Sequence, residues 1–309
     1  MTGVSAAVGR LRPTWRVVLY LPAYFFASLV IQIPLFVAWV IVLALSGQTP
    51  PARLEDIPLI VQVLSAGASL VAALGITFAF RRFVDRRPFL DLGLRITKGL
   101  ASEVIIGLAL GLVLIAGVFF IELGAGWLAF DGFAWESRAI SSLVTSLAGW
   151  FILFVCVAIY EELVFRGYVL QNLEYAWGPL VAALGSSVSF AVFHALNPGF
   201  GFLGWVGLIA AGLLLAYSYL LTRALWLPMA FHLAWNFAEG PLFSFPVSGL
   251  NTSGLLEVRP VGGDSLLTGG AFGPEGGLLG LLAVTLGGAI LWAWGRGSAK
   301  SAAQQEIST

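Results

Sequence analysis

Within the long apolar stretches of this chain, ionisable and amide side chains gather in three short segments. The first segment holds Glu161, Glu162 and Arg166, the second ends at His194, and the third runs from His232 to Asn236. Both histidines of the protein lie in these segments. An ionisable group inside an apolar helix is costly to desolvate, so such groups mark functional sites by default. We therefore treat the three segments as parts of one site.

The spacing in the first segment assigns different roles to its two carboxylates. Glu162 and Arg166 are four residues apart, so on a helix they share a face and can form an ion pair. Glu161 points about 100° away around the same helix, where this arginine does not neutralise it. A partly desolvated carboxylate without a cation is suited to act as a general base that takes a proton from water.

The two histidine segments can complete either of two kinds of site. His232 and Asn236 are also four residues apart and offer two donors side by side, which can stabilise an oxyanion, while His194 holds the attacking water with Glu161. Alternatively, Glu162 or Glu161 could bind one Zn²⁺ together with His194 and His232. Asparagine is a poor zinc ligand, and Arg166 beside Glu162 repels a cation. We therefore expect catalysis without a metal, with Zn²⁺ as the alternative.

The composition places these segments in a membrane protein. Of the 309 residues, 59% are hydrophobic and only 10% are charged, and the mean hydropathy is +0.94. An average soluble protein has about 25% charged residues. The net charge of zero leaves no basic face for nucleic acid. Cys156 is the single cysteine, so neither an intrachain disulfide nor a four-cysteine zinc site can form.

Apolar stretches predict an all-α bundle of about eight transmembrane helices in a single integral-membrane domain, residues 1–309. They lie near 17–45, 57–80, 103–123, 140–165, 179–197, 202–221, 225–240 and 276–294. With eight crossings, 16 lysines and arginines are divided unevenly, and only Arg53, Arg138 and Arg259 lie on one side. The positive-inside rule then places both termini in the cytoplasm, with Arg166 among the cytoplasmic residues. Residues 241–275, rich in glycine, proline and serine, are expected to form an extracytoplasmic loop.

The three segments resemble the signature of the CPBP family of intramembrane proteases, which includes type II CAAX prenyl endopeptidases and bacterial Abi-type proteins. That signature is EExxxR, FxxxH and HxxxN on separate helices, and this chain has EELVFR, FAVFH and HLAWN in that order. The resemblance covers about residues 140–240, the expected protease core. It implies that Glu161 is the base beside His194, that His232 and Asn236 stabilise the tetrahedral intermediate, and that Glu162 and Arg166 organise the site.

The resulting expectation is an endopeptidase that cleaves a membrane-associated peptide or protein within a multi-pass bundle in contact with membrane lipids. The low lysine and high alanine, glycine and leucine contents are typical of a bacterial plasma-membrane protein, for which a prenylated CAAX tail is not the expected substrate. One alternative is a transporter that uses Glu and His as a proton relay. The other is a non-catalytic member of the family that acts in immunity or as a scaffold.

The predicted spans leave one conflict about depth. Glu161 lies near the cytoplasmic end of its span, whereas His194 lies about 15 residues into the next one, or about 22 Å along a helix. The two side chains can meet only if a span boundary is wrong or a helix is tilted or broken. Glu122 and Glu239 lie near predicted span ends and are expected at the membrane interface.

Overall fold

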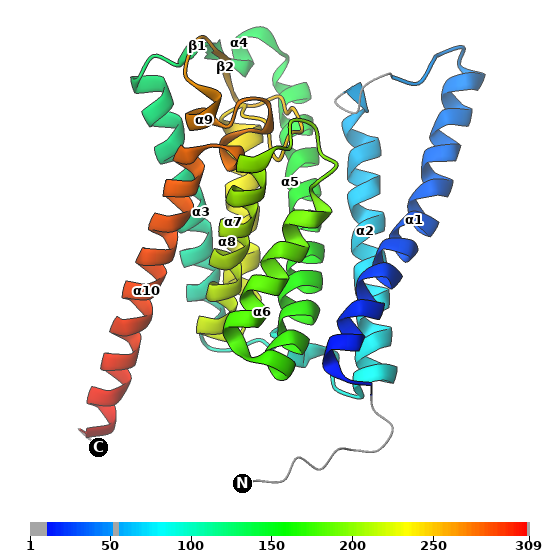
Figure 1. Ribbon diagram of the computed structural model, residues 1–309. Coiled ribbons are helices and arrows are strands. Elements are labelled where there is room, and N and C mark those ends of the chain that lie inside the picture. Colours follow the sequence, from blue (N-terminus) through cyan, green and yellow to red (C-terminus); the bar gives the residue numbers. More distant parts are fainter. Residues whose placement is uncertain (1–10, 52–55, 308–309) are drawn as a thin grey trace.

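The computed structural model describes residues 11–51 and 56–307 of the chain. Its long helices are α1 (Pro13–Leu45), α2 (Leu59–Ala79), α3 (Leu100–Gly124), α5 (Ile140–Glu162), α6 (Gln171–Phe193), α7 (Phe202–Thr222), α8 (Trp226–Phe237) and α10 (Leu278–Ile307). They run roughly side by side, and α1 begins on the same side of the bundle on which α10 ends (Figure 1). The all-α membrane bundle expected from the sequence is therefore the fold observed.

Six helical segments in the described part of the chain are long and apolar enough to cross a membrane. One of them, Ile140–Phe193, is 54 residues long and contains both α5 and α6. α8 has only 12 residues and continues into a π-helical segment, Ala238–Leu242. The span count of eight and the cytoplasmic side of the termini stay predictions. Arg10 and Arg53, which contributed to the charge argument, lie outside the described residues.

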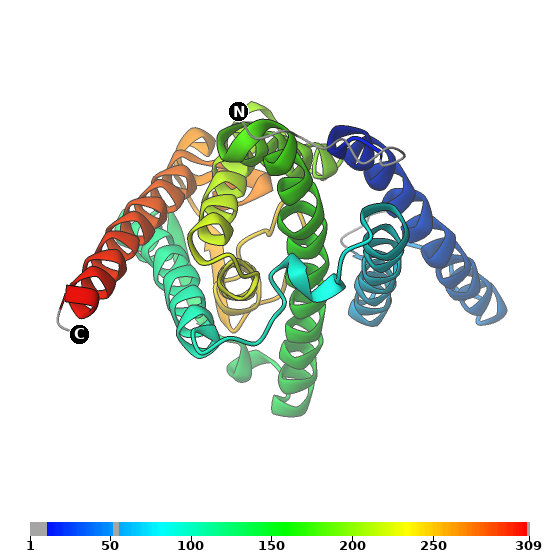
Figure 2. The same ribbon diagram turned by 90° about the horizontal axis from the view of Figure 1, so that it is seen from below.

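α8 lies at the centre of the bundle and contacts α3, α5 and α7 (Figure 2). Its closest neighbour is α3, which approaches through glycines spaced four residues apart. A Cβ at Gly107 would lie 2.6 Å from the carbonyl oxygen of Leu227, and one at Gly111 would lie 2.6 Å from that of Phe231. Small residues let helix backbones approach in this way inside membranes. The position of α8, and with it that of His232, depends on this contact.

The α1–α2 pair lies at one side of the bundle and is attached to it by polar and aromatic contacts (Figures 1 and 2). Asp85, in the π-helical segment Phe80–Asp85 after α2, forms ion pairs with Arg16 at 3.1 Å and with Arg81 at 3.2 Å. The Tyr168 hydroxyl donates to the same carboxylate, and the Tyr168 ring stacks on Tyr20 at 4.0 Å. These contacts connect the first two helices to the segment that follows α5.

The predicted loop 241–275 is folded over one end of the bundle. It contains β2 (Leu256–Pro260), α9 (Ser265–Thr268) and two short 3₁₀ turns, Gly270–Phe272 and Pro274–Gly276. β2 pairs antiparallel with β1 (Leu128–Phe133), which precedes the short helix α4 (Ala134–Ser137). Glycines let this segment approach the helices closely, since a Cβ at Gly207 of α7 would overlap the carbonyl oxygen of Glu275. The loop is therefore a closely packed cap.

Two sequence expectations are wrong. Arg166 is not at a cytoplasmic boundary, because its side chain is fully buried in the bundle. The span predicted to end at 165 continues as a helix into α6, because polar residues beyond it are paired inside the protein rather than exposed. Glu122 and Glu239 lie near the ends of α3 and α8 and are buried in the protein, at 2% and 0% exposure, and their place at the membrane interface stays a prediction.

Candidate active site

The first motif, residues 161–166, lies where the α-helix α5 passes into a π-helix. Glu161 and Glu162 are the last residues of α5, and the π-helical segment Leu163–Leu170 follows without a break. Every side chain of that segment is buried. π-helical insertions occur often at functional sites, where they shift side chains out of the regular helical order. Here the change of winding brings Arg166 into the core.

Glu162 and Arg166 form an ion pair that is entirely enclosed. Nη1 of Arg166 lies 3.0 Å from Oε1 of Glu162, and both side chains are 0% exposed. The guanidinium also donates to the carbonyl oxygen of Gly212 at 3.2 Å and lies 4.6 Å from the ring centre of Phe190. A buried charge without such partners is strongly destabilising. The pair is therefore a fixed part of the site's structure, as the spacing predicts.

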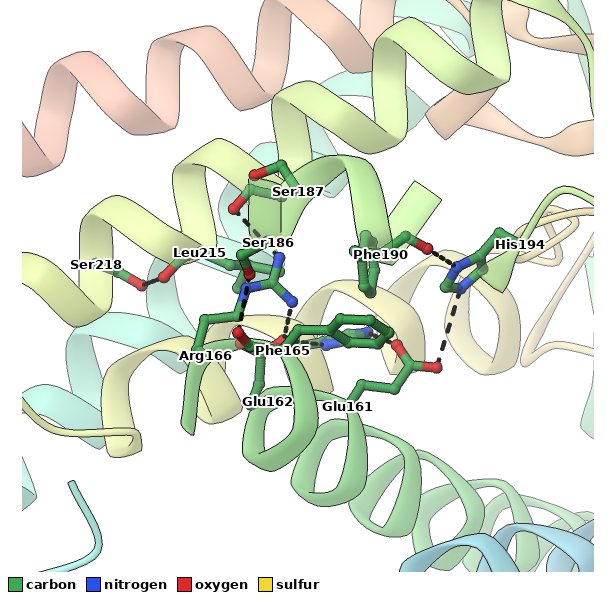
Figure 3. A network of polar contacts seen from close by, with 12 residues as sticks. Glu161, Glu162, Phe165, Arg166, Ser186, Ser187, Phe190, His194, Leu215 and Ser218 are labelled. Carbon is green, nitrogen blue, oxygen red and sulfur yellow. Dashed lines mark hydrogen bonds and ion pairs between the residues drawn. The ribbon is translucent and has the colours of Figure 1, made fainter. Parts of the chain in front are cut away.

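Both imidazoles have one nitrogen bound to an acceptor and the other directed toward Glu161. Nδ1 of His232 lies 2.9 Å from Oε1 of Glu162, and Nδ1 of His194 lies 2.9 Å from the carbonyl oxygen of Phe190. Because these oxygens accept, each Nδ1 carries the proton. The Nε2 atoms then lie 3.9 Å (His194) and 3.7 Å (His232) from the Glu161 carboxylate. Figure 3 shows Glu162 turned to Arg166 and Glu161 turned to His194.

The structure resolves the conflict about depth. The helix that carries Glu161 continues to a sharp bend at Gly178, where φ is 80° and ψ is 171°, and Pro179 begins the returning helix. Glu161 precedes Gly178 by 17 residues and His194 follows it by 16. The two side chains therefore lie at the same height on the two arms of one hairpin, about 24 Å from its bend.

Asn236 lies one turn after His232 on α8 and is 6% exposed. No residue that the structure describes hydrogen-bonds its amide. It lines a cavity of about 30 Å³ together with His232, among mostly apolar walls. An amide that is buried and still unpaired is available to an oxygen atom of a ligand. The structure thus brings together the six residues of the three motifs: Glu161, Glu162, Arg166, His194, His232 and Asn236.

Sequence reasoning missed a third carboxylate at this site. Glu275, in the cap, lines the same cavity and interacts electrostatically with His194, His232 and Glu161. Burial raises the pKa of its carboxyl, while a hydrogen bond from Ser248 and the imidazoles oppose that shift. It stands alone between glycines and a proline in the sequence, with no spacing that relates it to a helix face. Only the folded path of the cap brings it to the motifs.

Two tyrosines also lie near Glu161. Tyr24 of α1 and Tyr160 of α5 both interact electrostatically with Glu161. Aromatic residues are abundant in this chain, so the sequence does not mark these two tyrosines as residues of the site, although Tyr160 directly precedes the first motif.

The same geometry bears on the carboxylate and imidazole ligands that the sequence suggests for Zn²⁺. Oε1 of Glu162 is bound by both Arg166 and His232, so it is Glu161 rather than Glu162 that lies between the two Nε2 atoms. Within residues 11–51 and 56–307, no three His, Cys, Asp or Glu side chains are placed to hold one metal ion. The set Glu162, His194 and His232 that the sequence offered for Zn²⁺ does not fit as a ligand set, because the Glu162 carboxylate is already bound by Arg166 and by His232.

Fold and site together define a multi-pass membrane protein with a carboxylate–imidazole centre enclosed by its helices. Residues 143–238 match the model of the family described as Rce1-like type II CAAX prenyl endopeptidase. This match confirms the resemblance to CAAX-type membrane proteases that the motifs predict, and it contains all six motif residues. The comparison with curated proteins found no match.

Proposed function

We propose that this protein is an intramembrane endopeptidase that hydrolyses a peptide bond of a membrane-associated peptide or protein. The observation that carries the proposal is the placement of the Glu161 carboxylate against two imidazoles whose Nδ1 atoms are already bound to acceptors. The separations of 3.7 and 3.9 Å are slightly too long for direct hydrogen bonds. Polar groups at such distances are commonly bridged by water.

The reaction uses the side chains in a fixed order. Glu161 takes a proton from a water that His194 helps to hold, and the hydroxide adds to the carbonyl carbon of the substrate. The carbonyl oxygen becomes an oxyanion, which the Asn236 NH₂ group stabilises together with His232 in its doubly protonated form, whose Nδ1–H stays on Glu162 while its Nε2–H donates to the oxyanion. The C–N bond then breaks, and the proton on Glu161 passes to the leaving nitrogen. The products are a carboxylic acid and an amine, which exchange a proton to give a carboxylate and an ammonium, and Glu161 returns to its unprotonated state.

Glu162 and Arg166 support this chemistry without taking part in it. Glu162 accepts from Nδ1 of His232, which fixes the imidazole and leaves Nε2 directed at the reacting groups. Arg166 in turn holds Glu162. This chain of contacts explains why a tandem carboxylate is needed, since one carboxylate reacts and its neighbour orients.

The test is cleavage of a panel of membrane-tethered peptides by the purified protein. Glu161→Gln keeps the size of the side chain but cannot accept a proton, so cleavage should fall by about 10²-fold or more. Glu136→Gln, at an exposed position of α4, is the matched control and should cleave like the wild type. Near wild-type cleavage by Glu161→Gln would refute the assignment, and no cleavage by the wild type would favour a binding or transport role.

The same assay decides the role of metal. After prolonged dialysis against a chelator, we expect the wild type to retain its activity. Activity lost in proportion to bound zinc, and restored by added zinc, would instead make the protein a metalloprotease.

A further inference from the structure

Glu275 reaches the candidate site from outside the part of the chain that matches the family model. It belongs to the 3₁₀ turn Pro274–Gly276, immediately before α10. With His232 and Asn236 it supplies the polar side chains of the cavity, whose other walls include Leu208, Phe231 and Val284. A carboxyl in this position needs an explanation, because it is otherwise out of place among apolar walls.

The cap holds this carboxyl in a defined position. The Ser248 hydroxyl donates a hydrogen bond to Oε2 of Glu275. The backbone is fixed as well, because a Cβ at Gly207 would overlap the Glu275 carbonyl oxygen and one at Gly280 would overlap that of Pro274. Glu275 is therefore placed by contacts on both its side chain and its backbone.

Asn236 is the residue that lacks such support. The proposed reaction needs its NH₂ group to face the oxyanion, but the amide can turn over and present its oxygen instead. No described residue hydrogen-bonds the amide and so selects one orientation. An oxyanion donor is effective only when it is oriented before the charge develops.

The cavity can provide the missing contact. Its volume of about 30 Å³ exceeds the roughly 10–15 Å³ that one water molecule needs, and a buried water commonly bonds about three polar groups. A water here can donate one hydrogen to Oδ1 of Asn236 and the other to a carboxyl oxygen of Glu275. An ionised carboxylate only accepts, so it takes one hydrogen of the water and leaves the other directed along the cavity to Asn236. With that hydrogen on Oδ1, the NH₂ group faces away from this water and toward the reacting oxygen.

We propose that Glu275 is a positioning residue of the active site, which orients the Asn236 amide through a water held in this cavity. The inference rests on the proposed endopeptidase function. It needs an acceptor oxygen at position 275 and not a negative charge. This requirement distinguishes it from an electrostatic role or a role in proton transfer.

The experiment measures kcat and KM of the full-length protein on a membrane-tethered peptide that the wild type cleaves. Glu275→Met keeps the length of the side chain but removes the acceptor, so kcat should fall about 10-fold while KM stays within about twofold. Glu275→Gln keeps a carbonyl acceptor and should stay within about threefold of the wild type. Glu257→Gln is the matched control, because this cap carboxylate contacts Ser137 and not the cavity.

A second comparison separates positioning from a structural role. In an Asn236→Ala background, Glu275→Met should cause no further loss of kcat, since the amide that it orients is gone. Ala211→Leu, which fills the cavity from α7 and leaves Glu275 in place, should lower kcat as Glu275→Met does. This variant provides the test if Glu275→Met does not fold.

Several results would overturn the inference. These are an unchanged kcat in both Glu275→Met and Ala211→Leu, an additive loss in the Asn236→Ala background, or a loss in Glu275→Gln equal to that in Glu275→Met. The Glu161→Gln variant in the same assay shows which proposal has failed. If Glu161→Gln is inactive and Glu275→Met is normal, only the role of Glu275 is wrong, whereas full activity of Glu161→Gln overturns both.

Discussion

At the scale of single residues, the central feature is one carboxylate that is neutralised beside another that is not. Oε1 of Glu162 receives hydrogen bonds from Arg166 and His232, while the Glu161 carboxylate lies 3.7 and 3.9 Å from the two Nε2 atoms and has no cation paired with it among the described residues. Adjacent residues of a helix point in different directions, so this difference arises from sequence position alone. The same arrangement makes a clear prediction about stability.

Arg166→Ala should lower both thermal stability and activity. It leaves Glu162, at 0% exposure, without its cation, and breaking an enclosed pair costs about 3–5 kcal/mol. Adding Glu162→Gln removes the uncompensated charge, so the double variant should recover part of the stability but none of the activity. Melting temperature in detergent is the measurement, and an unchanged value in Arg166→Ala would contradict the importance of the pair.

The sequence predicts these residues well and their surroundings poorly. The six motif residues follow from i, i+4 spacing and from the scarcity of ionisable groups, both of which are local properties. The role of His232 as donor to Glu162 depends on contact between α5 and α8, which no spacing within either helix reveals. Glu275 depends on a long non-helical path, so its contact with the motifs is a property of the fold alone.

At the scale of elements, the hairpin of α5 and α6 shows why a span boundary was misplaced. Residues 163–177 include Arg166, Gln171, Asn172 and Glu174, which are typical of a loop outside the membrane. In the structure they are paired: Gln171 donates to the Leu92 carbonyl, Asn172 to that of Tyr168, and Glu174 contacts Arg223. Hydropathy records the polarity of a side chain but not whether a partner satisfies it, so it ends the helix too early.

The contact between α3 and α8 gives the prediction at this scale. Gly111→Ala places a methyl group 2.6 Å from the carbonyl oxygen of Phe231, the residue before His232. Such overpacking costs about 1–3 kcal/mol, and we expect a lower melting temperature together with reduced cleavage. Gly117→Ala on the same helix is the control, because its Cβ would meet nothing within 4 Å. Equal melting temperatures for the two variants would contradict the importance of this contact.

At the scale of the whole molecule, one end of the bundle is covered by the cap and by β1, which pairs with the cap's β2 (Figure 1). The segment that joins α2 to α3 is rich in arginine. It contains Arg86, Arg87, Arg95 and Lys98, all of which are exposed. The positive-inside rule assigns this segment to the cytoplasm and the cap to the other side.

Labelling of single cysteines tests this orientation. In a Cys156→Ser background, a membrane-impermeant maleimide should label Ser253→Cys in intact cells and Lys98→Cys only after permeabilisation. Both positions are exposed in the structure, so access depends on the side of the membrane. The reverse pattern would invert the orientation and place both termini outside.

For an endopeptidase of the kind proposed, the equal arms of the α5–α6 hairpin would also set where a substrate is cut. Glu161 and His194 lie about 24 Å above the bend, whereas the hydrocarbon layer is about 30 Å thick. With the bend at the cytoplasmic surface, the scissile bond lies within about two helical turns of the capped surface. The length of the hairpin arms would therefore fix the depth in the membrane at which the peptide bond is cleaved. A spanning substrate would lose its segment on the capped side and keep nearly all of its membrane anchor, so cleavage would release a product from the membrane without extracting the remainder.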